Sequence, residues 1–348
     1  MSEIERIPVA VVGVGRMGKH HARIYRSLPQ AQLVAVVDAD PDRGGAVADE
    51  FGCAAVTSVE ELIAKCPQVK AVTVAVPTVR HLAAAEPLMR HRIACLIEKP
   101  LAPSSAEAKK LVALAAEYGL PLQVGHTERF NPAVRAVAAM GITPRFMEVH
   151  RISPMTFRSL DVGVVMDMMI HDLDIVLSLA NSRLDKVDAA GVAVLGKHED
   201  VANARLVFAN GCVANITASR LALKTERKLR LFSEAAYVSL DYQKRTGILI
   251  RKSDNDAALS GIREQIRDGA DLSNLDYSNL VSVDELQMDG EGHADPLTAE
   301  LASFLEAVRS GKNPVVDGAA GVAAVEAAER VVDAIRKHKW DGLPAWDV

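Results

Sequence analysis

Cysteine is scarce in this 348-residue chain, and the copies present are not spaced for a metal or a disulfide framework. The four cysteines show neither a CxxC pair nor a spacing typical of zinc ligands. Cys95 lies in the apolar run Ile93–Ile97, where a free thiol serves as a small core residue. The sequence therefore argues against a disulfide-stapled secreted module, and we expect no metal site.

Long hydrophobic runs and a strong excess of charge are also missing. Aromatic residues make up 4% of the chain, charged residues 24%, and the net charge is −5. No apolar stretch approaches the ~20 residues of a membrane-spanning helix. Without a basic excess the sequence does not favour nucleic acid or an anionic membrane surface as a partner. Residues 1–6 are polar and acidic, unlike a signal peptide, so we expect a cytoplasmic protein that acts on a small molecule.

Two patterns of secondary structure divide the sequence near residue 125. In the first part, short apolar strands alternate with helical segments, which is typical of a doubly wound parallel sheet with helices on both faces. In the second part, long strands follow one another through short turns such as Asn210-Gly211, a dipeptide that favours hairpins. The sequence predicts an α/β domain at 1–125 and an α+β domain with an open, predominantly antiparallel sheet at 126–348.

Helices interrupt and end the second part. One is expected at about 164–180, and two alanine-rich helices near 297–310 and 319–337 are expected to pack back on the body. Between them, residues 253–296 carry eleven acidic residues against two basic ones. Such charge runs are usually solvated loops, and the alternative is a lid over the substrate or a contact between subunits.

The run Gly13-Val14-Gly15-Arg16-Met17-Gly18 follows a short apolar strand and precedes a helix-forming segment. This is the G-x-G-x-x-G fingerprint of a Rossmann dinucleotide-binding unit. Gly13 allows the tight turn, Gly15 lets backbone N–H groups approach a pyrophosphate, and Gly18 lets helix and strand pack closely. The N-terminus of the following helix adds partial positive charge to the anion site. A glycine-rich turn without a ligand is the alternative.

An acid closes the second strand of this unit. Asp38 follows the run Leu33–Val37 and lies 20 residues after Gly18, where a carboxylate can accept hydrogen bonds from both adenosine ribose hydroxyls. The same charge would repel a 2′-phosphate. Arg43, five residues further on, could meet such a phosphate, but two neighbouring acids surround it with negative charge. The sequence favours NAD over NADP.

A lysine follows directly on another apolar strand, in the tripeptide Glu98-Lys99-Pro100 after Ile93–Ile97. Because ligands of a doubly wound sheet bind beyond the carboxyl ends of its strands, Lys99 can reach the nicotinamide end of a bound dinucleotide. Pro100 restricts the backbone of Lys99 to extended conformations, which fixes where the ammonium points. A surface lysine is the alternative for this tripeptide taken alone.

Polar residues line one face of the helix expected at 164–180. Asp167, His171 and Asp174 lie at i, i+4 and i+7, and Asp172 lies about 100° round from His171. Such residues on an apolar helix need partners, because burying them unpaired is costly. A buried structural His–Asp pair and a zinc site are the alternatives to a catalytic pair, although no other His or Cys nearby completes a zinc site.

Taken together, the glycine fingerprint ending in Asp38, the Glu98-Lys99-Pro100 motif and the pattern Asp167-x-x-x-His171-Asp172 resemble the Gfo/Idh/MocA oxidoreductase family. The match runs through nearly the whole chain. It also includes Val76-Pro77-Thr78 with His81, Arg129-Phe130-Asn131-Pro132, Glu300 through Phe304, Gly311-Lys312-Asn313-Pro314 and Asp317-Gly318.

The resemblance implies hydride transfer between a sugar or polyol carbon and a nicotinamide. It implies that Lys99 orients the reacting hydroxyl and lowers its pKa, that His171 is the general base, and that Asp167 bonds the hydroxyl or fixes the imidazole. The open face of the second sheet would form the floor of the substrate pocket, and the protein would assemble as a homodimer or homotetramer. The implied cofactor contacts also include Arg16, Met17, Pro77, Thr78, His81 and Glu98.

Within the family, residues 151–163 and 125–132 resemble the nucleotide-sugar 3-dehydrogenase branch. This implies oxidation of the C3 hydroxyl of a sugar such as UDP-N-acetylglucosamine, for cell-envelope synthesis. Guanidinium groups suit a diphosphate, and Arg151, Arg158 and Arg220 are the candidates, with solvated surface charges as the alternative. An inositol, polyol or free-sugar dehydrogenase is the alternative in the family, and a non-catalytic NAD(P)-sensing regulator is the alternative outside enzymes. The expected substrate contacts are Arg129, Asn131, Arg158, Asp172 and Arg220.

Overall fold

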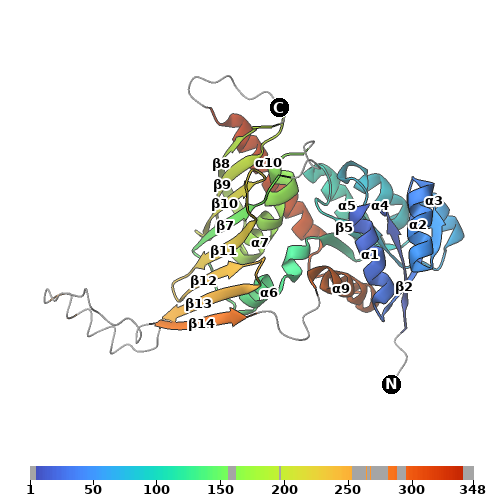
Figure 1. The fold of residues 1–348 in the computed structure, drawn as a ribbon, viewed down its shortest axis with the longest axis horizontal. Helices are drawn as coiled ribbons and strands as arrows, with labels where there is room; N and C mark the ends of the chain where they lie inside the picture. Colours follow the sequence, from blue (N-terminus) through green and yellow to red (C-terminus); the bar gives the residue numbers. More distant parts are fainter. Residues whose placement is uncertain are drawn as a thin grey trace.

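The chain folds into two sheets joined by helices (Figure 1). The computed structural model describes residues 5–155, 162–195, 197–252, 264, 267, 281–287 and 295–339. The first sheet has six strands and the second has eight, and the predicted fold class, a Rossmann sheet followed by an open, predominantly antiparallel sheet, is confirmed. Over the described ranges, no helix has the length and apolar character needed to cross a membrane.

All six strands of the first sheet run parallel. Most of their residues are buried and apolar, as expected for strands covered on both faces. The strand order is β3-β2-β1-β4-β5-β6, so the winding reverses between β1 and β4, which is where such folds bind ligands. The strands are β1 (Ile7–Val12), β2 (Ala31–Val37), β3 (Ala54–Val56), β4 (Ala71–Val74), β5 (Ala94–Glu98) and β6 (Leu122–Gly125).

Helices cover both faces of this sheet: α1 and α2 pack on one face, and α3, α4 and α5 on the other. The sequence sets their ends locally. For α5, the Ser104 hydroxyl accepts the N–H of Glu107 at the start, and Gly119 takes a φ of +63° at the end. The helical segments are α1 (Arg16–Ser27), α2 (Pro41–Phe51), α3 (Val59–Lys65), a 3-10 helix (Thr78–Arg80), α4 (His81–Arg90) and α5 (Ser105–Tyr118).

The second sheet has the order β14-β13-β12-β11-β7-β10-β9-β8. Its neighbouring strands are antiparallel except β7 and β10. The hairpin expected at Asn210-Gly211 joins β9 and β10, and Gly211 takes a φ of +84° there. The strands are β7 (Phe146–Ile152), β8 (Leu184–Val192), β9 (Val201–Phe208), β10 (Val213–Ser219), β11 (Glu226–Phe232), β12 (Ala236–Asp241), β13 (Thr246–Lys252) and β14 (Val281–Gln287).

The acidic segment 253–296 contains a strand, although its many charged residues had predicted a loop. Residues Val281–Gln287 form β14, which pairs with β13 at the edge of the second sheet. Valines at 281 and 283 alternate with polar residues, which is the strand period. The expectation of a solvated loop is therefore wrong for 281–287, and most of the remaining segment, with its proposed lid role, lies outside the described residues.

Helices lie on one face of the second sheet, between it and the first sheet (Figure 1). The helix expected at 164–180 is present, but its first part, Val165–Met169, is a π-helix that leads into α7 (Ile170–Ala180). A 3-10 helix (Thr127–Phe130) and α6 (Pro132–Ala139) precede it. The two alanine-rich helices are α9 (Pro296–Ser310) and α10 (Gly318–Lys337).

Helix α9 returns to the first sheet late in the chain. Its residues Leu301, Phe304 and Leu305 are fully buried in the same hydrophobic cluster as Tyr25 of α1. The segment after α9 also contacts β6, because the N–H of Val124 donates to the carbonyl of Val316. Helix α10 then packs against α5 beside the first sheet and against α7 and β8 of the second, so segments distant in sequence join the two parts.

Candidate active site

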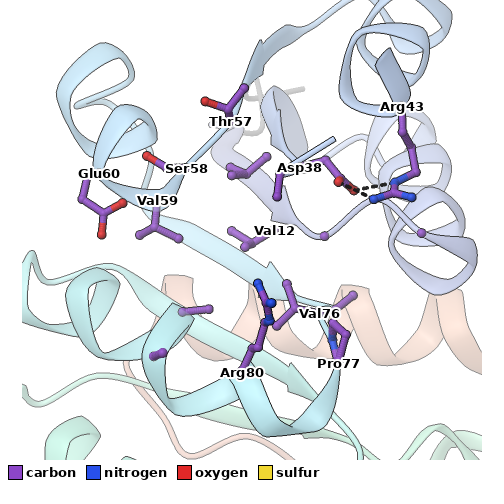
Figure 2. A pocket seen from close by; sticks show the side chains of 17 residues that line it. Val12, Asp38, Arg43, Thr57, Ser58, Val59, Glu60, Val76, Pro77 and Arg80 are labelled. Carbon is purple, nitrogen blue, oxygen red and sulfur yellow. Dashed lines mark hydrogen bonds and ion pairs between the residues drawn. The ribbon is translucent and has the colours of Figure 1, made fainter. Parts of the chain in front are cut away.

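A cavity of about 770 Å³ lies at the carboxyl ends of β1, β2 and β4, at the point where the strand order reverses. Figure 2 shows its walls: Asp38 and Arg43 face each other on one side, and Arg80 projects from the opposite side toward Val12. The full lining is Val12, Gly13, Gly15, Val37, Asp38, Ala39, Arg43, Thr57, Ser58, Val59, Glu60, Ala75, Val76, Pro77, Arg80, Ala83 and Ala84.

The glycine turn leaves room for a ligand at the backbone. Gly13 has a φ of +83°, and a Cβ there would lie 2.8 Å from the carbonyl oxygen of Ala75. At Gly18 a Cβ would lie 1.8 Å from the carbonyl oxygen of Gly13, so only glycine fits. Gly15 has no neighbouring atom within 4 Å of a Cβ among those described, so its backbone borders open space at the N-terminus of α1. This cradle fits the pyrophosphate of a dinucleotide.

Asp38 directly follows β2, and both of its carboxylate oxygens accept hydrogen bonds. Oδ2 accepts the N–H of Val14 at 2.9 Å, and Oδ1 accepts the N–H of Asp40 at 3.0 Å. The Arg43 guanidinium bonds both oxygens, at 2.9 and 2.7 Å (Figure 2). Burial opposes ionisation, but these hydrogen bonds outweigh it and hold the pKa of the Asp38 carboxyl below its usual range. Asp38 is a fixed anion at the position expected of a ribose-binding acid.

The other residues that were predicted to bind the cofactor lie at the wall of the cavity or beside it. Pro77 lines the cavity, and Thr78 begins the short helix behind it. Arg16 and Met17 are exposed in the first turn of α1, beside the cradle but outside the lining of the cavity. Arg80, which was not predicted from the sequence, supplies a cation to the cavity wall. Its one signal in the sequence is its position three residues after Pro77.

His81 and Glu98, which were also expected to contact the cofactor, have side-chain atoms that bond other groups of the protein. The His81 ring is buried, with Nδ1 3.2 Å from the carbonyl of Leu101 and Nε2 3.0 Å from that of Val76. The Glu98 carboxylate is also buried and bonds His21 at 2.9 Å. Both side chains therefore position the loops that bear Pro77 and Lys99, because their polar atoms are used inside the protein.

A second cavity, of about 210 Å³, brings the predicted catalytic residues together across the two sheets. Lys99 comes from the end of β5, and Asp167 and His171 come from the helix that covers the second sheet. The lining is Lys99, Arg151, Ser153, Pro154, Asp167, Met168, His171, Arg220 and Arg227.

Lys99 contacts the π-helical turn directly. Its Nζ donates to the backbone carbonyl of Asp167 at 2.6 Å and lies 3.5 Å from Oδ1 of the same residue. Insertions of π-helix are frequent at functional sites, because the wider turn redirects backbone groups. The ammonium is thereby held at the mouth of the cavity, with 19% of the Lys99 side chain exposed.

His171 is a neutral imidazole at the same cavity. Burial, together with the nearby Lys99 and Arg151 cations, lowers the pKa of His171 well below its usual value. Its Nδ1 atom is buried and has no hydrogen-bond partner in the part of the chain that the structure describes. A neutral ring can accept a proton at neutral pH, as a general base must.

Most of the arginines and acids that were expected to contact the substrate form ion pairs within the protein. Asp172 is fully buried and accepts two hydrogen bonds from Arg151, at 2.6 and 2.9 Å. Arg220 donates to Asp200 at 2.6 Å and to the carbonyl of Val162 at 2.8 Å. Both ion pairs are buried, and Arg220 also lines the cavity beside Lys99, so substrate contact by Asp172 and Arg220 stays a prediction.

The other residues that were expected to contact the substrate either bond different groups of the protein or lie outside the described residues. Asn131 caps α6, since its Oδ1 accepts the N–H of Ala133 at 3.0 Å. Arg129 pairs with Asp174 at 3.3 Å and lines a different cavity, and Asp174 does not line the cavity of Asp167 and His171. Arg158 lies outside the described residues.

Arg227 is the guanidinium that this cavity presents most openly. Its side chain is 45% exposed, whereas Arg151 and Arg220 are each 5% exposed. It pairs directly across the sheet with Arg151, on the face that the helices cover. The cavity that holds Lys99, Asp167 and His171 thus lies on the helix-covered face, and not on the open face that was expected to form the pocket floor. Among the described residues, no group of His, Cys, Asp or Glu could hold a metal ion.

A buried acid anchors the start of the catalytic helix. Glu199 accepts the N–H of Val165 at 3.1 Å, and its backbone carbonyl accepts the N–H of Val164. Gly163 lies against this carboxylate: a Cβ at Gly163 would be 2.0 Å from Oε1 of Glu199. The glycine therefore leaves space for the anchor that sets the position of Asp167 and His171.

We expect Gly163→Ala to lower the free energy of unfolding by about 1–2 kcal/mol, since it expels the buried Glu199 carboxylate from its hydrogen bond. It should also lower kcat/KM by about tenfold through misplacement of the helix. Urea unfolding and steady-state kinetics measure both effects. In a Glu199→Ala background the same glycine change should cost almost nothing, and a full additional loss there would contradict this account.

Both parts of the chain match family models. Residues 7–126 match the model described as an oxidoreductase family with an NAD-binding Rossmann fold, and residues 139–239 match that of the GFO/IDH/MocA C-terminal domain. The chain is 35% identical over 323 residues to the UDP-N-acetylglucosamine 3-dehydrogenase of Acidithiobacillus ferrooxidans, over 92% of this chain and 95% of that protein.

Two further similarities bear on function. The chain is 34% identical over 196 residues to the inositol 2-dehydrogenase of Rubrobacter xylanophilus, over 54% of this chain and 56% of that protein. A solved structure of the Acidithiobacillus ferrooxidans enzyme matches with a TM-score of 0.82 and 34% identity, over 95% of this chain and 98% of that one. The similarity to the nucleotide-sugar enzyme therefore extends through both sheets.

Proposed function

This chain belongs to the GFO/IDH/MocA oxidoreductase family, and on that premise we propose that it oxidises the C3 hydroxyl of a UDP-N-acetylglucosamine-like sugar to a 3-keto sugar, with NAD as electron acceptor. The observation that carries the proposal is the meeting of Lys99, Asp167 and His171 at one cavity beyond the carboxyl end of β5. The dinucleotide cradle at Gly13–Gly18 lies in the same sheet.

The chemistry follows from the charges of the three groups. The Lys99 ammonium lowers the pKa of a sugar hydroxyl bound beside it. His171 takes the hydroxyl proton on the nitrogen that faces the cavity, because its ring is neutral. Asp167 holds Lys99 through its carbonyl at 2.6 Å. When bound, the nicotinamide supplies the site that accepts the hydride from the sugar carbon.

Two observations favour a nucleotide sugar over a free polyol. The chain is 35% identical to the Acidithiobacillus ferrooxidans enzyme over 92% of its length, against 25% identity over 94% of its length to the inositol 2-dehydrogenase of Rhizobium meliloti. Arg227 also offers a half-exposed guanidinium at the cavity, which suits a diphosphate although one of its nitrogens lies 3.4 Å from Oε1 of Glu128. We therefore assign an anion contact to Arg227 beside the one expected of Arg220. An inositol or free-sugar dehydrogenase is the second candidate, supported by the 34% identity of the shorter match to the Rubrobacter xylanophilus enzyme.

The test is NADH formation with a panel of UDP-sugars, myo-inositol and free glucose. Turnover of UDP-N-acetylglucosamine with formation of a 3-keto product is expected. Turnover of myo-inositol or glucose with no response to any UDP-sugar would overturn the nucleotide-sugar proposal. No turnover with the whole panel, combined with NAD-dependent binding of a protein, would favour a regulator.

We expect Asp38→Asn to raise KM for NAD by about tenfold and to lower KM for NADP, because the amide keeps the shape but loses the charge that bonds ribose hydroxyls and repels a 2′-phosphate. Steady-state kinetics with both cofactors measures the change in preference.

The matched control is Arg43→Ala. It frees the Asp38 carboxylate from its guanidinium partner, which is half-exposed. KM for NAD should stay within about fivefold, since an exposed ion pair contributes at most about 1 kcal/mol. A variant Asp38→Asn that retained its preference for NAD would contradict the assignment of this residue to the ribose.

We further propose a homo-oligomer that uses the open face of the second sheet. The ring centroids of Phe146 and Phe232 lie 5.7 Å apart, and those of Phe232 and Tyr237 lie 4.9 Å apart. Ile248 and Val283, from neighbouring strands, are exposed beside them. Such apolar patches mark protein interfaces. Light scattering in solution measures the oligomeric state, and a monomer at micromolar concentration would contradict this proposal.

A further inference from the structure

His126 is a buried imidazole with no assigned role, although it lies beside the catalytic base. It follows directly on β6 and is 1% exposed. Its ring lies edge-on to that of His171, with centroids 6.3 Å apart and planes at 88°. Neither of its nitrogens has a hydrogen-bond partner within the described portion of the chain. The charged groups that act on it are Asp174, Lys99, Arg129 and Glu98.

Unpartnered buried atoms continue on both sides of this ring. Nδ1 of His171 and Oδ2 of Asp174 likewise have no hydrogen-bond partner among the described residues. Buried polar atoms without protein partners are usually bridged by ordered water, because leaving them unbonded is costly. Groups beyond direct hydrogen-bond reach are the ones that a water connects. The three side chains therefore mark a polar path through an otherwise apolar core.

The far end of this path opens toward a different cavity. Oδ1 of Asp174 accepts a hydrogen bond from Arg129 at 3.3 Å. The Arg129 side chain is 18% exposed and lines a cavity of about 400 Å³ that also contacts Ser178 and Ser303. None of the residues that line this cavity lines the catalytic one. The path thus runs from the catalytic base to a separate opening.

The reaction needs such a path. Oxidation of an alcohol releases one hydride and one proton, and the proton is first taken by His171. The catalytic cavity, about 210 Å³, is where the sugar binds under the proposed function, so bound substrate covers the front nitrogen of His171. The ring must lose its proton before the next turnover, and its second nitrogen, Nδ1, faces the interior.

We propose that His126 and Asp174 relay the substrate proton from Nδ1 of His171 to the cavity lined by Arg129, an inference that rests on the proposed function. The O–H bond of the sugar breaks as the cavity-facing nitrogen of His171 gains the proton. The Nδ1–H bond then breaks toward a bridging water and His126, and the proton leaves past Asp174. A neutral His126 offers one donor and one acceptor, as a relay requires; burial lowers its pKa despite the nearby Asp174 carboxylate.

The kinetic test follows NADH and proton release together by stopped flow, with a pH-indicator dye, NAD and UDP-N-acetylglucosamine in weak buffer. His126→Phe keeps a planar ring but removes both nitrogens. We expect proton release to lag behind NADH formation, kcat to fall by about tenfold, and KM values to change by less than about twofold. His91→Phe, at the exposed C-terminal end of α4, should change none of these.

A test without substrate uses nitrogen NMR of the histidines. In the native chain the Nδ1 proton of His171 should exchange with solvent faster than in His126→Phe or in the isosteric Asp174→Asn. Asp174→Asn also serves where His126→Phe fails to fold. Equal exchange rates, or proton release that keeps pace with NADH in both variants, would overturn the relay. Failure of the native enzyme to oxidise any UDP-sugar would overturn the proposed function instead, and the NMR comparison would still decide the relay.

Discussion

Lys99→Met should lower kcat/KM for the sugar by about a thousandfold, the range lost when a charged group that stabilises the reacting oxygen is removed. Methionine keeps the length of the side chain but loses the ammonium that now bonds the carbonyl of Asp167 at 2.6 Å. KM for NAD should change little, because the glycine cradle and Asp38 remain. Steady-state kinetics with saturating NAD measures the loss.

Two variants sharpen this prediction. Lys19→Met removes an equally positive charge from the exposed surface of α1 and should leave kcat/KM unchanged. Lys99→Arg keeps the charge with a different shape and should recover only part of the rate, since guanidinium and ammonium groups are not interchangeable at a fitted site. Retention of more than a tenth of the activity in Lys99→Met would remove Lys99 from the proposed mechanism.

His171→Gln should lower kcat by about 10²–10⁴-fold, the usual contribution of a general base.

A second prediction concerns how the activity of the native enzyme depends on pH. Burial and the nearby Lys99 cation lower the pKa of His171 well below its usual value, so the ring stays neutral as pH falls through 6.5. Activity should therefore persist below that pH, and its acid limb should begin only when the lowered pKa is reached.

The sign of the electrostatic effect can be checked with the same profiles. Removal of the positive charge in Lys99→Met favours protonation of His171, so the acid limb of that variant should move to higher pH. The profile is measured as kcat/KM from pH 4.5 to 9 with saturating NAD. An acid limb at or above pH 6.5 in the native enzyme would show that His171 is not held neutral by its surroundings.

The cofactor half of the site was predictable because its signals are local. The tight turn, the spacing from Gly18 to Asp38 and the strand before Lys99 all lie within short stretches, and parallel strands bring their carboxyl ends to one edge. The structure places Gly13, Gly15 and Asp38 at a single cavity, as that reasoning requires. The edge strand β3 escaped prediction because it has only three residues, two of them exposed.

The substrate half was harder because its ion pairs join residues far apart in the chain. Asp172 meets Arg151, 21 residues away, and Arg220 meets Asp200, 20 residues away, and nothing local marks either pair. A charged residue without an oppositely charged neighbour in the sequence can therefore still have an ion-pair partner in the fold. The π-helical turn before α7 was hidden for a similar reason, because its hydrophobic pattern is that of an ordinary helix. His126 carried one weak signal: a histidine directly after a buried strand.

The return of α9 to the first sheet bears on how enzymes of this kind can be recombined. Leu301, Phe304 and Leu305 fill the same hydrophobic cluster as Tyr25, although 276 positions separate Tyr25 from Leu301. A chimaera that took residues 1–125 from one parent and everything after them from another would pair α9 with a foreign α1. Productive exchange of the substrate part requires three junctions, one after β6 and one on each side of α9, so that α9 stays with the parent of the first sheet. The cofactor module is thus inherited as two separate stretches of gene.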